Sequence, residues 1–361
     1  MKFFRAHSDS FAIAGLAVLL AALGAVDLLR PFGLRFSDLT GRIVTLDTMI
    51  RIGILTIVVV GLNLLMGYAG QISLGQAGFY ALGAYASGIL STLAVRHNIL
   101  PGVSDSWWWP WLAIAAGMAL TAGFAYVVGR PILRLKGNYL AMATLGLGFI
   151  INILCAEFPA LTGGNDGLTE IPRLRIGAFL LWPMQRYYFL VWAAARLAIA
   201  VALNLVHSRF GRALRAIHYG QTAAETCGVD TERAKVQALV ISAALASLAG
   251  SLYAHFQSAV SPNPFSFTVS VELVTMAAVG GLASIWGAPL GVAALFLLGD
   301  VIRSQSERVL HIQSGGFELI LYGALLVLIM IFLPAGVTAS GVDFLRRLRR
   351  RRAKAPEGDA A

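Results

Sequence analysis

The chain alternates long apolar runs with short polar connections. Ten runs, most of them about 20 residues long, occupy residues 11–29, 50–66, 77–95, 110–129, 139–157, 187–206, 236–257, 267–281, 290–302 and 316–333. An apolar helix of that length spans the roughly 30 Å hydrocarbon core of a bilayer, where a helix satisfies its own backbone groups. The pattern therefore predicts an all-α, polytopic transmembrane bundle of about ten helices.

Composition supports a membrane protein and indicates that the positive net charge comes largely from one basic segment. The chain is 58% hydrophobic and 13% charged, which excludes an ordinary soluble enzyme, and its 38 glycines predict closely packed helices. The net charge of +10 owes much to a basic segment after the last run. We expect residues 1–345 to form one transmembrane domain and residues 346–361 a basic cytoplasmic tail that contacts membrane lipid and binds no nucleic acid.

The basic connections predict the topology. With the tail in the cytoplasm, an even number of spans places both termini on the cytoplasmic side of the inner (plasma) membrane. The basic connections 130–136 and 208–235 then fall on that side, as the positive-inside rule requires. The connection 30–51, which includes Arg51, falls outside against the rule. Residues 11–25 also fit a cleaved signal, but we expect an uncleaved first helix because the apolar stretch continues.

Two glycine-rich segments interrupt the apolar pattern, at residues 66–78 and 279–289. Irregular backbone at membrane depth is tolerated only where protein buries it or a water-filled cavity satisfies it. These helix breaks are therefore candidates for a translocation path. They share a Gly-x-x-Ser spacing, in which Gly70 and Ser73 correspond to Gly281 and Ser284. That spacing is either a trace of an internal repeat, which is common in transporters, or a coincidence of two ordinary turns.

The first break carries the side chains that we expect to line the path. A solute that must be released again needs small neutral polar groups beside backbone that it can approach closely. The candidates are Gln71, Ser73 and Gln76 with Gly70 and Gly75. Capping of two helix ends is the alternative role for these residues. In an exterior loop, Asn165 and Asp166 could meet an incoming binding protein or form an asparagine turn.

The connection 208–235 is long, charged and helical in pattern. Ser208 predicts the N-cap of a short helix, and Thr222 with Glu225 has the spacing of a capping box that starts a second helix. Gly228 would end the second helix in a left-handed turn. We expect a helix pair parallel to the membrane that docks on a soluble partner, although a solvated connector remains the alternative.

Several segments, taken together, resemble a known family. They are SRFGRALRAI at 208–217, AAE-x-x-G at 223–228, VGGLASIWG at 279–287, GQISLGQAGF at 70–79, LTGGNDGL at 161–168 and LP-x-G at 333–336. In order and spacing they resemble the permease subunits of ATP-binding cassette importers, specifically the branched-chain amino acid family of the LivM type. The resemblance implies a coupling helix in residues 208–235 that sits in a groove of a separate ATPase.

The resemblance also implies residues and partners. The coupling residues would be Arg212, Arg215, Ala223, Ala224, Glu225 and Gly228. The partners would be a second, similar permease, two ATP-binding cassette ATPases and an extracytoplasmic substrate-binding protein, and the cargo a branched-chain or related amino acid. One departure stands at 218–221, where His-Tyr-Gly-Gln replaces the arginine and acidic residues usual in the family. The contacts at that end of the coupling helix are therefore open.

The sequence contains no nucleotide-binding or catalytic signature. A Gly-x-x-x-x-Gly-Lys-Ser/Thr segment is absent, so ATP would be bound by separate subunits. No catalytic triad, paired-carboxylate motif or metal-ligand spacing occurs, and we predict a non-enzyme with no cofactor, no catalytic residues and no metal site. The competing interpretation is an ion-coupled secondary transporter or channel for small polar solutes. A membrane-embedded enzyme is a third, less favoured class.

Ionisable residues within apolar runs need an explanation, since each costs about 2.5–3.5 kcal/mol at a helix centre. Glu157, His255 and Asp300 lie near predicted ends, so we expect their side chains to reach the interface. Arg196 lies nearer mid-span and should face a partner subunit, the substrate or the bundle interior. For Glu272 we expect a packing or inter-helix hydrogen-bond role.

Overall fold

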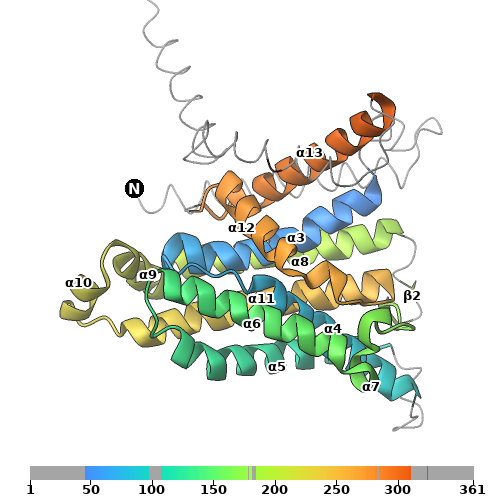
Figure 1. Cartoon of the computed structure of the whole chain (residues 1–361), viewed down its shortest axis with the longest axis horizontal. Helices are drawn as coiled ribbons and strands as arrows, with labels where there is room; N and C mark the ends of the chain where they lie inside the picture. The colour runs from blue at the N-terminus through green and yellow to red at the C-terminus, as the bar shows by residue number, and fades with distance from the viewer. Residues whose placement is uncertain are drawn as a thin grey trace, which may run out of the picture.

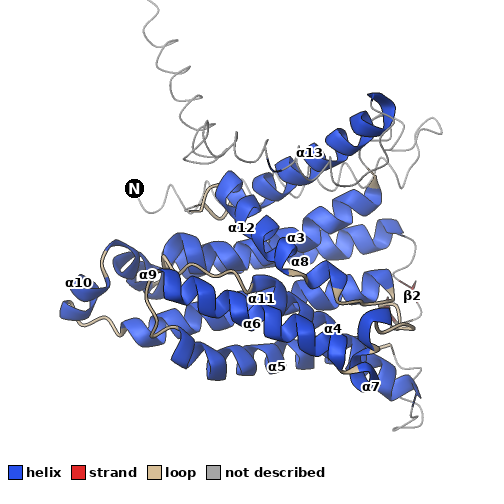
Figure 2. Ribbon diagram, in the orientation of Figure 1, coloured by secondary structure: helices blue, strands red, loops and turns tan. Residues whose placement is uncertain are grey.

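The computed structural model describes residues 45–96, 107–177, 179–180, 184–282, 284–309 and 323, and almost all of the regular structure in them is helical (Figure 2). The elements are α3 (Leu46–Asn63), the π-turn η2 (Leu64–Tyr68), α4 (Gln76–Arg96), α5 (Trp109–Ile132), α6 (Asn138–Glu157), α7 (Pro159–Thr162), η3 (Gly164–Asp166), β1 (Arg175–Ile176), β2 (Phe179–Leu180), α8 (Met184–His207), α9 (Arg209–Tyr219), α10 (Gln221–Thr226), α11 (Thr231–Gln257), η4 (Asn263–Phe265), α12 (Phe267–Gly280) and α13 (Gly287–Val309). The two short strands form an antiparallel hairpin.

Eight of the ten predicted apolar runs coincide with described helices, namely α3 to α6, α8 and α11 to α13. Five helices in this part of the chain are long and apolar enough to cross a membrane: α3 with η2, α5, α6, α8 and α11. Helix α12 and the apolar part of α13 are shorter. The runs at 11–29 and 316–333 and the basic tail lie outside the described residues. A helical, multi-pass architecture is confirmed, whereas a total of about ten helices stays a prediction.

The long helices lie side by side, with a group of short elements at each end. Figure 1 shows α9 and α10 together at one end of the bundle and α7 with the strands at the other. We refer to these as the α9–α10 end and the α7 end.

Helices α4 and α11 form the centre of the bundle and approach each other through small residues. A Cβ on Gly250 would collide with the carbonyl oxygen of Tyr80, and a Cβ on Gly83 would collide with the backbone of Ser247. The Ser251 hydroxyl donates a hydrogen bond to the Gly83 carbonyl at 3.1 Å. Small residues permit this contact, which explains why a buried central helix such as α4 is rich in Gly and Ser.

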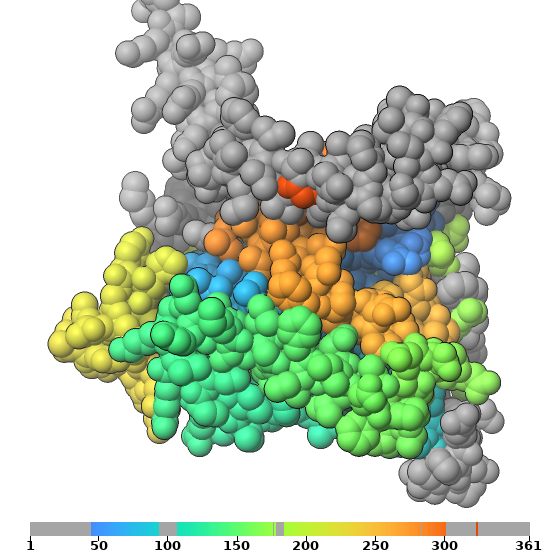
Figure 3. Space-filling view, viewed as in Figure 1, coloured from blue at the N-terminus to red at the C-terminus, as the bar shows by residue number. Residues whose placement is uncertain are grey.

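Helices α5 and α6 present apolar side chains outward. Leu120 and Val127 of α5 and Ile150 and Ile153 of α6 are each more than half exposed. These helices form the green face in the space-filling view (Figure 3). A contiguous apolar surface of this kind needs lipid or a second protein to cover it, as expected for a membrane protein.

Candidate functional site

The first predicted helix break is present and partly buried. After the π-turn η2 the backbone is irregular from residue 69 until α4 begins at Gln76. Ser73 and Gln76 are almost completely buried. The amide of Leu74 donates to the Thr144 hydroxyl of α6 at 3.1 Å, and a Cβ on Gly75 would collide with the Thr144 carbonyl oxygen. Residues 69–75 are here called the α3–α4 break, and its last two residues, Leu74 and Gly75, pack tightly against α6.

The polar side chains of the α3–α4 break have different surroundings. The Gln76 amide nitrogen donates to the Ser242 carbonyl at 3.2 Å and to its hydroxyl at 3.0 Å, which joins α4 to α11. The Ser73 hydroxyl and the Gln76 amide oxygen are buried with no partner among the described residues. Gln71 donates to the Ala69 carbonyl and closes a local turn. Ser73 and Gln76 therefore offer buried polar atoms to water or solute, whereas Gln71 has a local role.

The second break joins α12 to α13 in a tight hairpin. A Cβ on Gly280 would collide with the carbonyl oxygen of Gly287, and Gly291 packs equally closely on the carbonyl of Met276. Gly281 has a φ of +100°, which favours glycine at the turn. The Asn63 side chain donates to the Ser284 carbonyl at 3.1 Å. That hydrogen bond connects the end of α3 directly to the second break.

Helix α9 is anchored on one face and exposed on the other. The Ser208 hydroxyl caps the helix by accepting from the Phe210 amide at 3.1 Å, as predicted. Leu214 and Ile217 are buried against the bundle. Arg212 and Arg215 lie on the exposed side, where Arg212 donates to the Ser208 carbonyl and Arg215 to the Val206 carbonyl. Two of the predicted coupling residues are thus on the surface at the α9–α10 end.

Helix α10 ends as predicted but does not begin as predicted. Gly228 has a φ of +79°, its amide donates to the Glu225 carbonyl at 2.9 Å, and the next amide, Val229, donates to the Ala224 carbonyl at 3.0 Å. This is a Schellman end. The prediction of a capping box was wrong. The N-cap is Gly220, which has extended backbone, and the helix starts at Gln221. Thr222 therefore lies inside the helix and does not cap it.

The Glu225 carboxylate binds neighbours within the chain. Its Oε1 accepts from the Gln221 amide at 2.9 Å and from the Thr231 hydroxyl at 2.7 Å. These two hydrogen bonds hold the pKa of the Glu225 carboxyl below its usual value. Gln221 in turn accepts from the Lys235 ammonium at 2.7 Å. Gln221, one of the residues that depart from the family pattern, therefore fastens α10 to α11.

The remaining coupling residues, Ala223 and Ala224, differ in exposure. Ala224 is buried and Ala223 is exposed. The most exposed large side chain nearby is that of Tyr219, which is 91% exposed at the end of α9 and which the sequence interpretation did not select. An exposed aromatic side chain on the same helix as exposed Arg212 and Arg215 suits a protein interface, where Tyr and Arg are enriched. Solvent exposure cannot be read from a short charged segment alone.

His218 connects α9 to the α3–α4 break. A Cβ on Gly70 would lie 2.9 Å from Nδ1 of His218 and 3.5 Å from its Cα. Gly70 has a φ of +66°, so the backbone turns sharply at the point of contact. The surface helix therefore contacts the exposed start of the break. The other end of the break contacts Thr144 of α6 and leads into Gln76, which binds Ser242 of α11.

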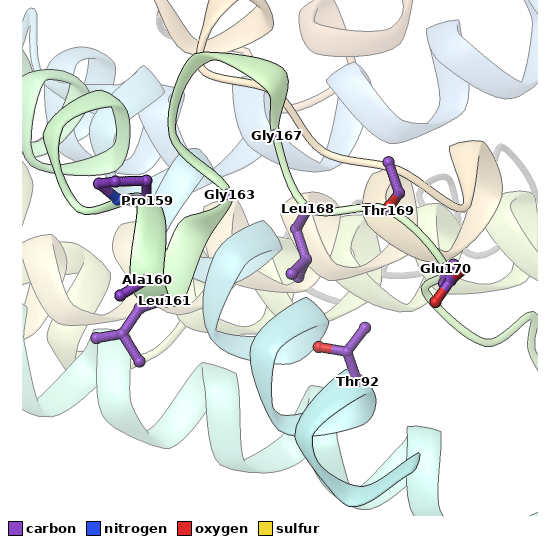
Figure 4. Close-up of a pocket in the computed structure, with 9 residues that line it drawn as sticks. All are labelled: Thr92, Pro159, Ala160, Leu161, Gly163, Gly167, Leu168, Thr169 and Glu170. Atoms are coloured by element: carbon purple, nitrogen blue, oxygen red, sulfur yellow. The ribbon is translucent and has the colours of Figure 1, made fainter. Parts of the chain in front are cut away.

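A cavity of about 240 Å³ opens at the α7 end. Figure 4 shows it between Thr92 of α4 and the segment 159–170. Gly163 and Gly167, both with positive φ, shape the loop around it. Asn165 and Asp166 are exposed in η3, and neither lines the cavity.

The ionisable residues near the predicted helix ends have different surroundings. Glu157 is exposed at the end of α6, as predicted. Asp300 is half-buried and accepts from the Thr48 hydroxyl of α3 at 3.3 Å, and its position at the interface stays a prediction. The prediction for His255 was wrong. It is fully buried, and its two ring nitrogens contact the Ser87 hydroxyl at 2.9 Å and the Pro172 carbonyl at 2.7 Å. The histidine ties α11 to α4 and to the loop at the α7 end.

Arg196, Glu272 and Arg51 differ in their partners. Arg196 is half-buried in α8, and the described residues provide no hydrogen bond or ion pair for its side chain. The carboxylate of Glu272 likewise has none among them. Arg51, predicted in an exterior connection, lies in the second turn of α3 and pairs with Asp47 at 2.7 Å. No group of three or more candidate metal ligands comes together in the described part of the chain.

Comparison with known proteins identifies the family. Residues 44–331 match the family described as the branched-chain amino acid transport system permease component. The chain belongs to this family. Among its relatives, the high-affinity branched-chain amino acid transport system permease protein LivM of Escherichia coli K12 is 32% identical over 316 residues, which cover 81% of this chain and 69% of that protein. No solved structure matches the chain.

The relatives include both permease types. LivM of Salmonella typhimurium is 32% identical over 300 residues, covering 77% of this chain and 66% of that protein. LivH of the same organism is 26% identical over 297 residues, which cover 78% of this chain and 90% of that protein. The matched region therefore spans about two thirds of these two LivM proteins. The higher identity to LivM confirms the predicted type.

Proposed function

We propose that this chain is the membrane-spanning permease subunit of an ATP-binding cassette importer for branched-chain or related amino acids. The names of the LivM and LivH relatives support the cargo and a second, similar permease as partner. Because the sequence has no phosphate-binding loop, we assign ATP to two separate ATPase subunits. An extracytoplasmic binding protein would deliver the amino acid at the α7 end, and both termini would be cytoplasmic.

The contact of α9 with the α3–α4 break carries this proposal. One face of α9 is free to meet an ATPase, through Arg212, Arg215 and Tyr219, while its other face is packed on the bundle. His218 lies against Gly70, so a push on α9 reaches the irregular backbone of the break without passing through a flexible linker. Movement of this break relative to α6 and α11 would open the path on alternate sides.

Substitution of the exposed tyrosine tests the coupling surface. In cells that hold the whole transporter, Tyr219→Ala should lower ATP-driven leucine uptake about tenfold, the effect of losing roughly 1.4 kcal/mol of coupling. The matched control is Tyr139→Ala, because Tyr139 is also well exposed but lies on α6 outside the loop. Both variants should reach the membrane in normal amounts.

Binding of the ATPase gives a second readout. A cysteine at exposed Ala223 should form a cross-link to the ATPase subunit, whereas a cysteine at Thr169, at the α7 end, should not. Equal uptake by the two tyrosine variants, together with no cross-link at residue 223, would contradict the coupling assignment. A cross-link at residue 169 would place the loop on the wrong side.

A further inference from the structure

A second cavity, of about 150 Å³, lies among α3, α4, α11, α12 and α13 and combines charged with apolar walls. One charged wall is Arg51 of α3 and the other is Glu272 of α12. Apolar walls are provided by Ile54, Leu55, Val269 and Phe296. The site thus has one positive group, one negative group and an aliphatic surface within one small volume.

The Arg51 guanidinium and the Glu272 carboxylate do not form an ion pair with each other. Arg51 pairs through Nε with Asp47, one turn earlier on α3, which leaves further N–H donors on the guanidinium. The described residues contain no ion pair between Arg51 and Glu272, and the Glu272 carboxylate has no hydrogen-bond partner among them. Charged groups within membrane helices are costly and usually mark a ligand or ion path. Because an arginine and a glutamate both line this cavity, a ligand with one negative and one positive group would complement it.

Two tyrosine rings form an aromatic wall of the cavity. Tyr80 of α4 and Tyr253 of α11 both line it, with ring centroids 5.9 Å apart. Phe265 packs behind both tyrosines, 4.9 Å from Tyr80 and 5.9 Å from Tyr253. Aromatic faces attract ammonium groups. The tyrosine wall therefore suits the positively charged end of a ligand, which Glu272 would also attract.

We propose that this cavity binds a zwitterionic amino acid with an aliphatic side chain on its way through the membrane, an inference that rests on the proposed function. The guanidinium of Arg51 would hold the carboxylate, and Glu272 with the tyrosine rings would hold the ammonium. The apolar walls would cover the side chain. A cavity of this size admits a molecule about as large as benzene, which is comparable to a branched aliphatic side chain.

The position of the cavity links it to the α3–α4 break. Tyr80 follows Gln76 by one turn of α4, so both side chains lie on the same face of that helix. The break, with the buried polar atoms of Ser73 and Gln76, is thus next to the cavity, on the side from which α4 starts. Bound substrate would lie about one turn of α4 from the break, and displacement of the break by α9 would move Tyr80 and release the substrate.

Charge-removing variants test the site in the assembled transporter. In proteoliposomes that contain both permeases, the ATPases and the binding protein, Glu272→Gln and Arg51→Gln should each lower the maximal rate of leucine uptake at least tenfold. Stimulation of ATP hydrolysis by the binding protein should persist, because the α9–α10 surface is intact. The control Glu157→Gln removes an exposed carboxylate outside the cavity and should leave both rates unchanged.

Thiol protection locates the ligand independently of transport rates. The two native cysteines, Cys155 and Cys227, are free and can be replaced by serine. In that background, leucine should slow the reaction of Leu55→Cys with a water-soluble methanethiosulfonate about fivefold or more. Isoamylamine and 4-methylpentanoate, which each lack one charge, should not. Thr169→Cys, in the cavity at the α7 end, should react equally with and without leucine.

The outcomes separate the two proposals. If the wild-type complex shows no ATP-dependent leucine uptake, the proposed function fails. If the wild type transports leucine but the charge variants match Glu157→Gln, or Leu55→Cys is unreactive or unprotected, the cavity is not the substrate site. Protection at residue 169 alone would place the ligand at the α7 end instead.

Discussion

Replacement of Gly75 by alanine tests how tightly the α3–α4 break is held. The added Cβ would collide with the Thr144 carbonyl oxygen and lie 3.1 Å from its carbonyl carbon. Carbon atoms in good contact are about 3.5–4.0 Å apart. Both colliding groups are backbone, so no side-chain rotation relieves the overlap, and the break must move away from α6.

The cost of that movement has two parts. Overpacking of this kind costs about 1–3 kcal/mol. Displacement also breaks the hydrogen bond from the Leu74 amide to the Thr144 hydroxyl, which contributes about 0.5–1.5 kcal/mol. The expected loss of stability is therefore about 1.5–4.5 kcal/mol, enough to lower the melting temperature by several degrees.

A dye that reacts with thiols measures this loss directly. Cys155 is buried in α6 and becomes reactive when that helix separates from the bundle. With exposed Cys227 replaced by serine, the melting curve of the detergent-solubilised protein reports the packing around α6. The control is Gly146→Ala, also on α6, because a Cβ there meets nothing within 4 Å. It should leave the melting temperature unchanged or raise it slightly.

The reasoning is refuted if Gly75→Ala and Gly146→Ala melt at the same temperature. It is also refuted if Gly75→Ala lowers stability but leaves leucine uptake per folded molecule untouched, since the break would then have no part in transport.

Three further predictions concern other contacts. Gly250→Ala should destabilise the protein by about 1–3 kcal/mol through its collision with α4, whereas Gly123→Ala, with open space around it, should not; equal melting would contradict the α4–α11 packing. His255→Phe should destabilise the protein by a similar amount, because it removes the hydrogen-bond partner of the Ser87 hydroxyl and of the Pro172 carbonyl. An unchanged melting curve would argue against both hydrogen bonds. The Glu225 carboxyl has a pKa below its usual 4.5 in the folded chain, so its stabilisation is present above that value and is lost as pH falls through the lowered pKa. Hydrogen exchange of the α10 amides, corrected for intrinsic rates, should accelerate in acid in the wild type but not in Glu225→Gln. The same acceleration in both proteins would show that protonation of the Glu225 carboxylate does not cause the faster exchange.

The sequence predicted the helices well because the apolar runs are long and the bilayer fixes their length. It also located both helix breaks, since glycine and neutral polar residues are unusual within apolar runs. The end of α10 followed from Gly228 for a local reason, its left-handed backbone. These features depend on residues close together in the chain.

Features that depend on tertiary contacts were missed. Thr222 and Glu225 have the spacing of a capping box, but Gln221 and Thr231 compete for the carboxylate and Gly220 starts the helix earlier. His255 is near a helix end, yet the loop that carries Pro172 folds over it. Arg51 and Glu272 are 221 positions apart in the numbering of the chain, and only the packing of α3 on α12 brings them to one cavity. No periodicity in the sequence records those neighbours.

Reconstitution tests most directly whether the chain is driven through α9 and α10 by separate ATPases. Leucine uptake is measured in proteoliposomes that contain this permease and its partner, with and without the ATPase subunits, under ATP or under an imposed ion gradient. We predict uptake only when the ATPases, ATP and the binding protein are all present. Uptake by this chain alone along an ion gradient would contradict the account and identify a secondary transporter.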